Sequence, residues 1–210
     1  MATLKDIQKP YDAAFSLGHN CFPAIYLRNH NLRPFAGVLD WMISFSLSEV
    51  NKLLENRFAN FLKKENLTFE SYFANGLTLK IRDNLYSIDS AHDFLAKNNT
   101  PTSWPEYDEV YTKYKRRAER FLDTLEKSDD LLFVRLGGTY EDARRLESVL
   151  ASLVKGNFKV LLVINGEVED FTELQWNLAH TCVLQYPIFD MDKLRDEAKW
   201  AKLFDGMSLK

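Results

Sequence analysis

The sequence contains only two cysteines among its 210 residues, Cys21 and Cys182. They lie far apart in the chain, so they do not provide the disulfide framework that is typical of small secreted domains. The histidine, cysteine and acidic residues also show no spacing that is typical of a metal site. We therefore expect two free thiols in a reducing compartment, and neither a metal nor another cofactor.

Long apolar runs and an excess of one charge are also absent. No apolar stretch approaches the roughly 20 residues of a membrane-spanning helix, and the N-terminus lacks the apolar segment of a secretory signal. Lys and Arg number 27 against 30 Asp and Glu, so the charge does not favour a nucleic-acid partner. We expect a cytoplasmic protein with no membrane or nucleic-acid partner, acting on a small molecule or peptide. The sequence indicates neither the identity of that substrate nor the oligomeric state.

The last third of the chain alternates between apolar runs and helical patterns. Strands are predicted at 131–136, 159–165 and 181–187, with a helix over 141–155 and a short helix near 171–178. Uninterrupted apolar runs are typical of strands buried on both faces, and the crossover helix predicts parallel pairing. With a further strand over 11–17, the expected fold is α/β, with a mostly parallel, doubly wound, Rossmann-like sheet and helices on both faces.

The middle of the chain has shorter strand patterns. Segments at 67–72, 77–82 and 85–88 are separated by turn residues, which favours a small antiparallel β-meander. The stretch 89–105, rich in Pro and Asn, is predicted to be an exposed loop. Residues 67–105 are therefore expected to form a hairpin and loop insertion in a single α/β domain that spans 1–210. Helices are predicted over 47–64, 106–127 and 192–204, and a buried loop with a short helix over 31–46.

The strongest candidate for a functional site lies near the N-terminus. A predicted strand breaks at Gly18, and His19, Asn20 and Cys21 then lead into a predicted helix over 21–29. Unpaired N–H groups in the first turn of a helix lower the pKa of a nearby thiol, which favours a reactive Cys21. Asn20 is placed to cap this helix. A free cysteine is also commonly a small buried apolar residue, so a purely structural role for Cys21 stays open.

A longer pattern runs through this stretch. It reads Ser-Leu-Gly, two residues, Cys, then Ala and Leu-Arg, and ends in Asp-Trp, at Ser16, Leu17, Gly18, Cys21, Ala24, Leu27, Arg28, Asp40 and Trp41. The pattern resembles the signature of a bacterial family labelled as papain-like cysteine peptidases, formerly a domain of unknown function. Further similar elements are His92-Asp93-Phe94, Arg116-Arg117 and Phe133-Val134-Arg135. The resemblance implies a cysteine and a histidine in one cleft and, from the family's label, peptidase activity.

Cysteine catalysis needs a histidine that takes the thiol proton and a group that orients the imidazole. We predict Cys21 as the nucleophile and His92 as the base, because His92 falls on the expected loop, where functional residues gather. Asp93 or Asp40 would orient His92, and N–H groups at the helix start would bind the oxyanion. The substrate-binding candidates are His19, Asn20, Arg28, Trp41 and Arg135. His30 at a helix end and His180 before a strand have ordinary structural explanations.

A second interpretation needs no catalysis. Arg135 ends an apolar strand, where it would bind an anionic group or form a buried pair with Asp40. In that interpretation the chain is a binding or transferase-like α/β module that holds an anionic ligand through Arg28 and Arg135, and Cys21 only packs. The turn after Arg135 lacks the Lys-Ser/Thr end of a phosphate-binding loop, so it does not favour a nucleotide.

Overall fold

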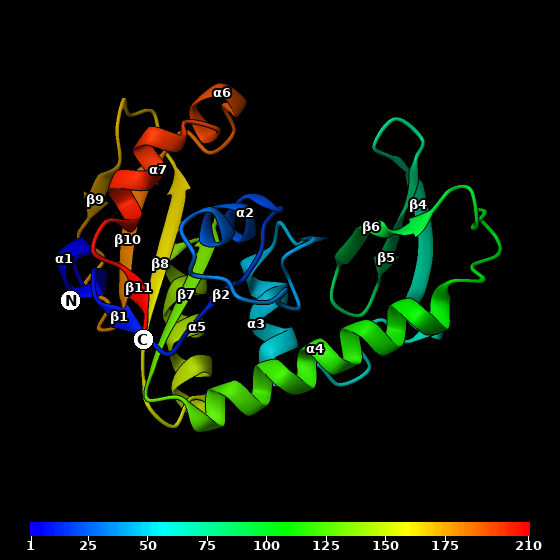
Figure 1. The fold of residues 1–210 in the computed structure, drawn as a ribbon, viewed down its shortest axis with the longest axis horizontal. Helices are drawn as coiled ribbons and strands as arrows, with labels where there is room; N and C mark the ends of the chain where they lie inside the picture. Colours follow the sequence, from blue (N-terminus) through cyan, green and yellow to red (C-terminus); the bar gives the residue numbers. More distant parts are fainter.

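The computed structural model describes residues 1–210 and is organised around a five-stranded sheet (Figure 1). Across the sheet its strands are β2 (Ala13–Ser16), β7 (Asp130–Leu136), β8 (Asn157–Asn165), β10 (Thr181–Tyr186) and β9 (Thr172–Leu174). The first four strands are parallel, and β9 pairs antiparallel with β10. The three strands predicted in the last third of the chain are thus confirmed, as is the strand that precedes Cys21.

Helices cover both faces of this sheet. Successive residues of a strand point to opposite faces, and in these strands the residues on both faces are apolar. On one face Leu131 and Phe133 pack against α3 (Leu47–Glu55), α4 (Tyr107–Lys127) and α5 (Tyr140–Leu153). On the other, Leu132 and Val134 share a core with α1 (Leu4–Ile7), α2 (Phe22–Asn29), α6 (Met191–Leu194) and α7 (Glu197–Phe204). No helix has both the length and the apolar character needed to cross a membrane.

The predicted mixed α/β class, with a mostly parallel sheet, is confirmed. The parallel strands follow one another across the sheet in chain order, from β2 at the edge to β10. A doubly wound sheet instead reverses its strand order at an internal switch point. The finer Rossmann-like arrangement is therefore not confirmed.

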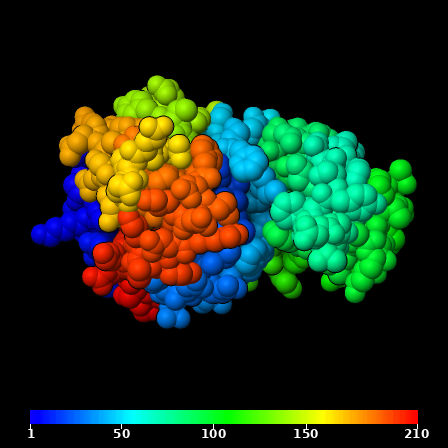
Figure 2. Space-filling model, turned by 90° about the horizontal axis from the view of Figure 1, so that it is seen from above, coloured from blue at the N-terminus to red at the C-terminus, as the bar shows by residue number.

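A second, four-stranded sheet lies beyond α3, towards the N-terminal end of α4 (Figures 1 and 2). It consists of β3 (Met42–Ile43), β6 (Ile88–Leu95), β5 (Thr78–Asp83) and β4 (Leu67–Phe73), all antiparallel, and a short 3-10 helix, η1 (Lys64–Asn66), precedes β4. The predicted antiparallel meander is confirmed, but its third strand begins at Ile88, where the predicted segment 85–88 ends. A third, two-stranded sheet joins β1 (Pro10–Tyr11) to β11 (Ser208–Leu209) near the two ends of the chain.

The helix predicted over 47–64 is wrong in its second half. α3 ends at Glu55, and the chain then turns through left-handed backbone conformations at Arg57, Phe58, Asn60 and Leu62. The apolar spacing persists there because Phe58, Phe61 and Leu62 are still buried in the core, although no helix carries them. These residues are buried without being helical, and their apolar spacing therefore led to the wrong prediction of a helix.

Four smaller predictions also need correction. The loop predicted over 89–105 is a strand up to Leu95, because β6 pairs with both β5 and β3. The short helix predicted near 171–178 is strand β9, which pairs with β10. The helix predicted over 192–204 is broken into α6 and α7, since Asp196 caps a new helix at Ala198 and Lys199. The stretch 31–46 contains β3 and turns in place of the short helix.

Candidate functional site

The turn after β2 brings His19 and Asn20 to the carboxyl end of the parallel sheet. Gly18 adopts φ +79°, and a Cβ at this position would lie 2.4 Å from Ser44 Oγ, so only glycine fits the turn. His19 donates its backbone N–H to Ser44 Oγ at 3.0 Å and accepts the Ser44 N–H at 3.0 Å. The turn is therefore attached to the segment that follows β3.

Arg135, on β7, holds this attachment in place. All five N–H donors of its fully buried guanidinium are used within the protein. Nη1 donates to Leu17 O (2.8 Å) and Ser44 Oγ (3.1 Å), Nη2 to Ser44 O (2.6 Å) and Phe45 O (3.1 Å), and Nε to Gly137 O (3.3 Å). Because none of these donors is left for a ligand, the geometry gives Arg135 a structural role, with neither an anion nor Asp40 as its partner.

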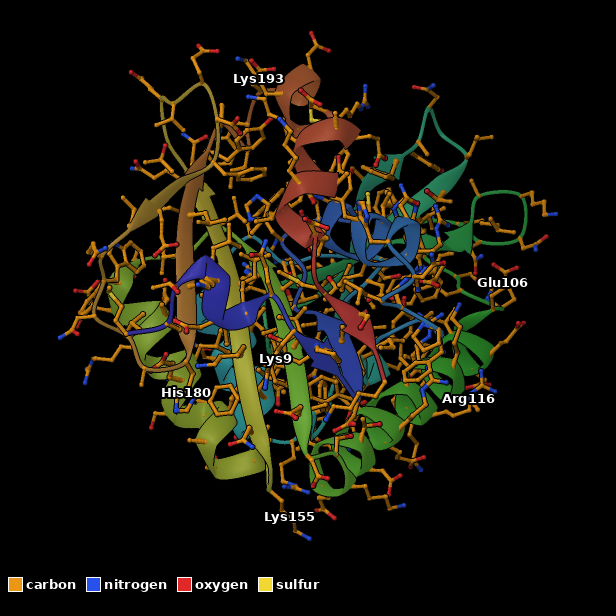
Figure 3. All side chains as sticks on the ribbon, turned by 60° about the vertical axis from the view of Figure 1, so that its left-hand side comes forward. Lys9, Glu106, Arg116, Lys155, His180 and Lys193 are labelled. Carbon is orange, nitrogen blue, oxygen red and sulfur yellow. The ribbon has the colours of Figure 1, made fainter.

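A cleft of about 540 Å³ opens above this arrangement. Its walls come from the segments that follow β2, β7 and β10 and from the second residue after β3. They consist of His19, Asn20, Phe45, Gly137, Gly138, Ile188, Phe189 and Met191. The cleft thus lies at the carboxyl edge of the parallel strands, where α/β proteins commonly bind ligands. In Figure 3 the label of Lys193, on α6, marks this end of the sheet, and the labels of His180 and Lys155 mark the opposite end.

His19 forms part of the wall as a neutral side chain. It is 6% exposed, and its ring lies 4.9 Å from the Phe45 ring and 6.2 Å from the Phe189 ring. Burial, assisted by the nearby positive charge of Arg135, lowers the pKa of His19 to about 4. Its Nδ1 is buried against Gly137 without a hydrogen-bond partner, so Nε2 is the ring nitrogen that remains for a ligand.

Cys21 directly follows these two residues and is the N-cap of α2, half-buried and free of any disulfide. The predicted lowering of its thiol pKa is wrong. Burial raises the pKa of the Cys21 thiol, and this effect outweighs its own backbone N–H and the charge of Arg195, which act in the opposite direction. The thiol is therefore protonated near neutral pH.

The start of α2 offers fewer free N–H groups than a typical helix. Asn20 precedes the N-cap Cys21, so it is not the cap residue, but its Oδ1 accepts the N–H of Phe22 at 3.0 Å, and Pro23 has no N–H. The backbone N–H groups of Asn20, Cys21 and Ala24 make no hydrogen bond to another residue. The donors available near the thiol thus include Asn20 and Cys21 of the preceding turn.

The predicted base His92 lies on another sheet, away from the loop expected for it. It is an exposed residue of β6, with its ring 5.4 Å from that of Phe73 and 6.2 Å from that of Trp41. Asp93, beside it, accepts from Lys113 (2.6 Å), Tyr114 OH (2.7 Å) and Ser90 (2.8 Å) and does not bond His92. No hydrogen bond joins any histidine to Cys21.

Asp40 and Trp41 form a separate cluster with Arg33. Asp40 Oδ2 accepts from Arg33 Nη1 and from the Gly37 N–H, each at 2.7 Å, and Arg33 also lies over the Trp41 ring at 5.5 Å. Burial raises the pKa of Asp40, although the Gly37 N–H and Arg33 act against this shift. Both partners of Asp40 thus belong to its own loop, and neither is a histidine. Arg28 is exposed in the last turn of α2 and makes no hydrogen bond through its side chain.

The structure therefore places His19 and Asn20 in one cleft with Cys21 next in the chain, whereas the side chains of His92, Asp93, Asp40 and Trp41 contact other residues. Sequence reasoning missed Phe45, Ile188, Phe189 and Met191 of the cleft wall. The last three follow β10, and their position after the carboxyl end of a predicted parallel strand was a signal that could have found them. Phe45 had no such signal, because its place depends on the contact between Arg135 and the chain after β3.

The fold and the cleft define an α/β protein with a candidate binding site at the carboxyl edge of its parallel strands. Residues 12–167, more than half of the chain, match the family described as "Putative papain-like cysteine peptidase (DUF1796)". The chain belongs to this family, as its sequence resemblance predicted. Neither the curated proteins nor the solved structures gave a match.

Proposed function

We propose that this protein is a cysteine-dependent hydrolase that attacks an acyl carbon with the Cys21 thiol. The observation that carries the proposal is the position of Cys21, half-buried at the start of α2 and directly after the cleft residues His19 and Asn20. Membership of a family described as cysteine peptidases supports the same chemistry at the level of the family.

The reaction would proceed through an acyl-enzyme. Sγ of Cys21 forms a bond to the carbonyl carbon while the thiol proton passes to a base, and the free N–H groups of Asn20 and Cys21 stabilise the oxyanion. The leaving group departs with that proton. Water then attacks the thioester, which releases the acid and restores the thiol.

Two histidines compete for the role of base. His92 is the sequence prediction, with Asp93 or Asp40 to orient it, and it requires β6 to approach the start of α2. His19 is favoured by position, because it is the histidine that lines the cleft. A neutral imidazole accepts a proton, but a pKa of about 4 makes His19 a weak base, so we expect slow turnover.

Acylation by a simple activated ester tests the proposal. With p-nitrophenyl acetate, intact-mass and peptide mass spectrometry should find one acetyl group on Cys21 and none on the fully buried Cys182. The Cys21→Ala variant should remain unlabelled. Absence of acetyl-Cys21, or equal hydrolysis by the variant, would refute the proposal.

A second candidate is a binding or transferase-like module in which Cys21 is inert. It is favoured by the raised pKa of the thiol and by the lack of a hydrogen bond from any histidine to it. Of the two arginines predicted to hold an anionic ligand, only Arg28 has free donors. An unreactive Cys21 in a protein that still binds ligands in the cleft would support this candidate.

A further inference from the structure

The cleft that His19 and Asn20 line has no charged side chain in its wall. Of its polar members, His19 is neutral because of its low pKa, and Asn20 carries no charge. The remaining wall is apolar or glycine, and its volume of about 540 Å³ is within the range of small-molecule sites. A charged group that entered this cleft would lose hydration without gaining an ionic partner.

Two exposed phenylalanines lie near His19 in the wall of the cleft. Phe45 is 65% exposed and Phe189 69% exposed, although side chains of this size are ordinarily buried. The His19 ring lies 4.9 Å from the Phe45 ring and 6.2 Å from the Phe189 ring. Met191 also lines the cleft. We call the part of the cleft that Phe45, Phe189 and Met191 line the aromatic slot.

His19 supplies a polar atom at the same place. The side chain is buried to more than nine-tenths, and its Nδ1 is buried against Gly137 without a hydrogen-bond partner. Nε2 is not fully buried and makes no hydrogen bond within the protein, so it is the ring nitrogen that a molecule in the cleft can bond. An N–H or O–H donor of a bound molecule would satisfy Nε2.

We propose that the aromatic slot binds the uncharged acyl chain of the substrate, with the polar end of the acyl group at His19 and beside Cys21. This inference rests on the proposed function, because it names the substrate class of the same site. The apolar chain lies against Phe45 and Phe189, and longer chains cover more of both rings.

Straight-chain amides provide a test that is independent of the thiol chemistry. Butyramide, hexanamide and octanamide are uncharged, carry an N–H donor and do not acylate a thiol, so their binding to the full-length Cys21→Ala variant is measured by calorimetry. We expect the affinity to increase roughly two- to fourfold for each added methylene. Octanoate should bind at least tenfold more weakly than octanamide, because the slot offers its charge no partner.

Matched variants locate the effect. Phe189→Ser should weaken octanamide binding about tenfold, whereas Leu77→Ser, which alters an equally exposed apolar side chain in the turn between β4 and β5 (69% exposed), should leave it unchanged. Both positions are exposed, so neither change threatens the fold. Affinity that does not depend on chain length, equal binding of octanoate, or equal losses in both variants would overturn the inference.

The outcomes also separate this inference from the proposed function. If amide binding depends on chain length but Cys21 is not acetylated, the aromatic slot is supported and the role of Cys21 as nucleophile is refuted. If Cys21 is acetylated but amide binding does not depend on chain length, the nucleophile is supported and the aromatic slot is refuted.

Discussion

Arg135 donates a hydrogen bond of 3.1 Å to Ser44 Oγ, and the same oxygen accepts the backbone N–H of His19 at 3.0 Å. One buried guanidinium thus connects β7 to the chain after β3 and, through Ser44, to the turn that carries the candidate site. The cleft therefore depends on a residue that does not line it.

The first prediction concerns the stability that Arg135 provides. Arg135→Met leaves the carbonyl groups of Leu17, Ser44 and Phe45 buried without these donors, so we expect the free energy of unfolding to fall by about 3 kcal/mol in urea titrations. The control is Arg28→Met, which removes an exposed arginine and should change stability by less than about 0.5 kcal/mol. Similar effects of the two variants would contradict the structural role of Arg135.

A second prediction concerns the loss of stability at acidic pH that is caused by His19. The pKa of His19 is about 4 in the folded chain and near 6.5 when unfolded, so below pH 6.5 the unfolded chain binds this proton more readily. The stability contribution of neutral His19 is thus present above pH 6.5 and is lost as the pH falls towards 4. Between pH 7 and 4.5, the wild type should lose about 2 kcal/mol more than His19→Asn.

His19→Asn suits this comparison because asparagine does not titrate and tolerates the positive φ of +97° at this position. Acidic residues such as Asp40 titrate in both proteins, and their contributions cancel in the difference. Parallel pH dependences in the two proteins would show that His19 is not buried as described.

The third prediction is the pH dependence of thiol reactivity. Since burial raises the pKa of Cys21, alkylation by iodoacetamide should keep accelerating beyond pH 8.5, the ordinary thiol midpoint. Cys182 should not react over the same range, because burial raises its pKa to about 12. Peptide mass spectrometry distinguishes the two sites. A rate that reaches a plateau below pH 8 would indicate a resting thiolate and contradict the electrostatics of this site.

The fourth prediction compares the two candidate bases. Because His19 lines the cleft and His92 packs between Phe73 and Trp41 on the other sheet, we expect His19→Asn to slow acetylation of Cys21 more than His92→Asn does. Stopped-flow release of p-nitrophenolate measures both rates. A larger loss in His92→Asn would restore the assignment made from the sequence.

Much of the fold could be predicted from the sequence, namely wherever the spacing of the buried residues matches the secondary structure that they form. The apolar runs at 131–136 and 159–165 are strands because helices cover them on both faces, and the break at Gly18 followed by Pro23 marks the start of α2. At 56–62 the apolar spacing is helical but the backbone is not, because turns with positive φ bury these apolar residues. The spacing of apolar residues indicates which residues are buried. It identifies a helix only where the backbone of those residues is also helical.

The candidate site was only half predictable for a related reason. His19, Asn20 and Cys21 adjoin in the chain, so their proximity needs no knowledge of the fold. His92 was assigned by the loop-like composition that follows it, but pairing of β6 with β3 and β5 places it on a sheet. Phe45 and Phe189 both lie near His19 through contacts between residues distant in the sequence, and such contacts cannot be inferred from a single sequence.

The time course of p-nitrophenolate release from p-nitrophenyl acetate tests most directly whether Cys21 is a nucleophile. We expect a burst of about one equivalent per chain, with acetyl-Cys21 formed faster than acetyl-N-acetylcysteine at the same pH, followed by slower hydrolysis of the thioester. Cys21→Ala should abolish the burst. Acetylation no faster than that of the free thiol, or a stable acetyl-Cys21 that water does not release, would contradict a hydrolase built on Cys21.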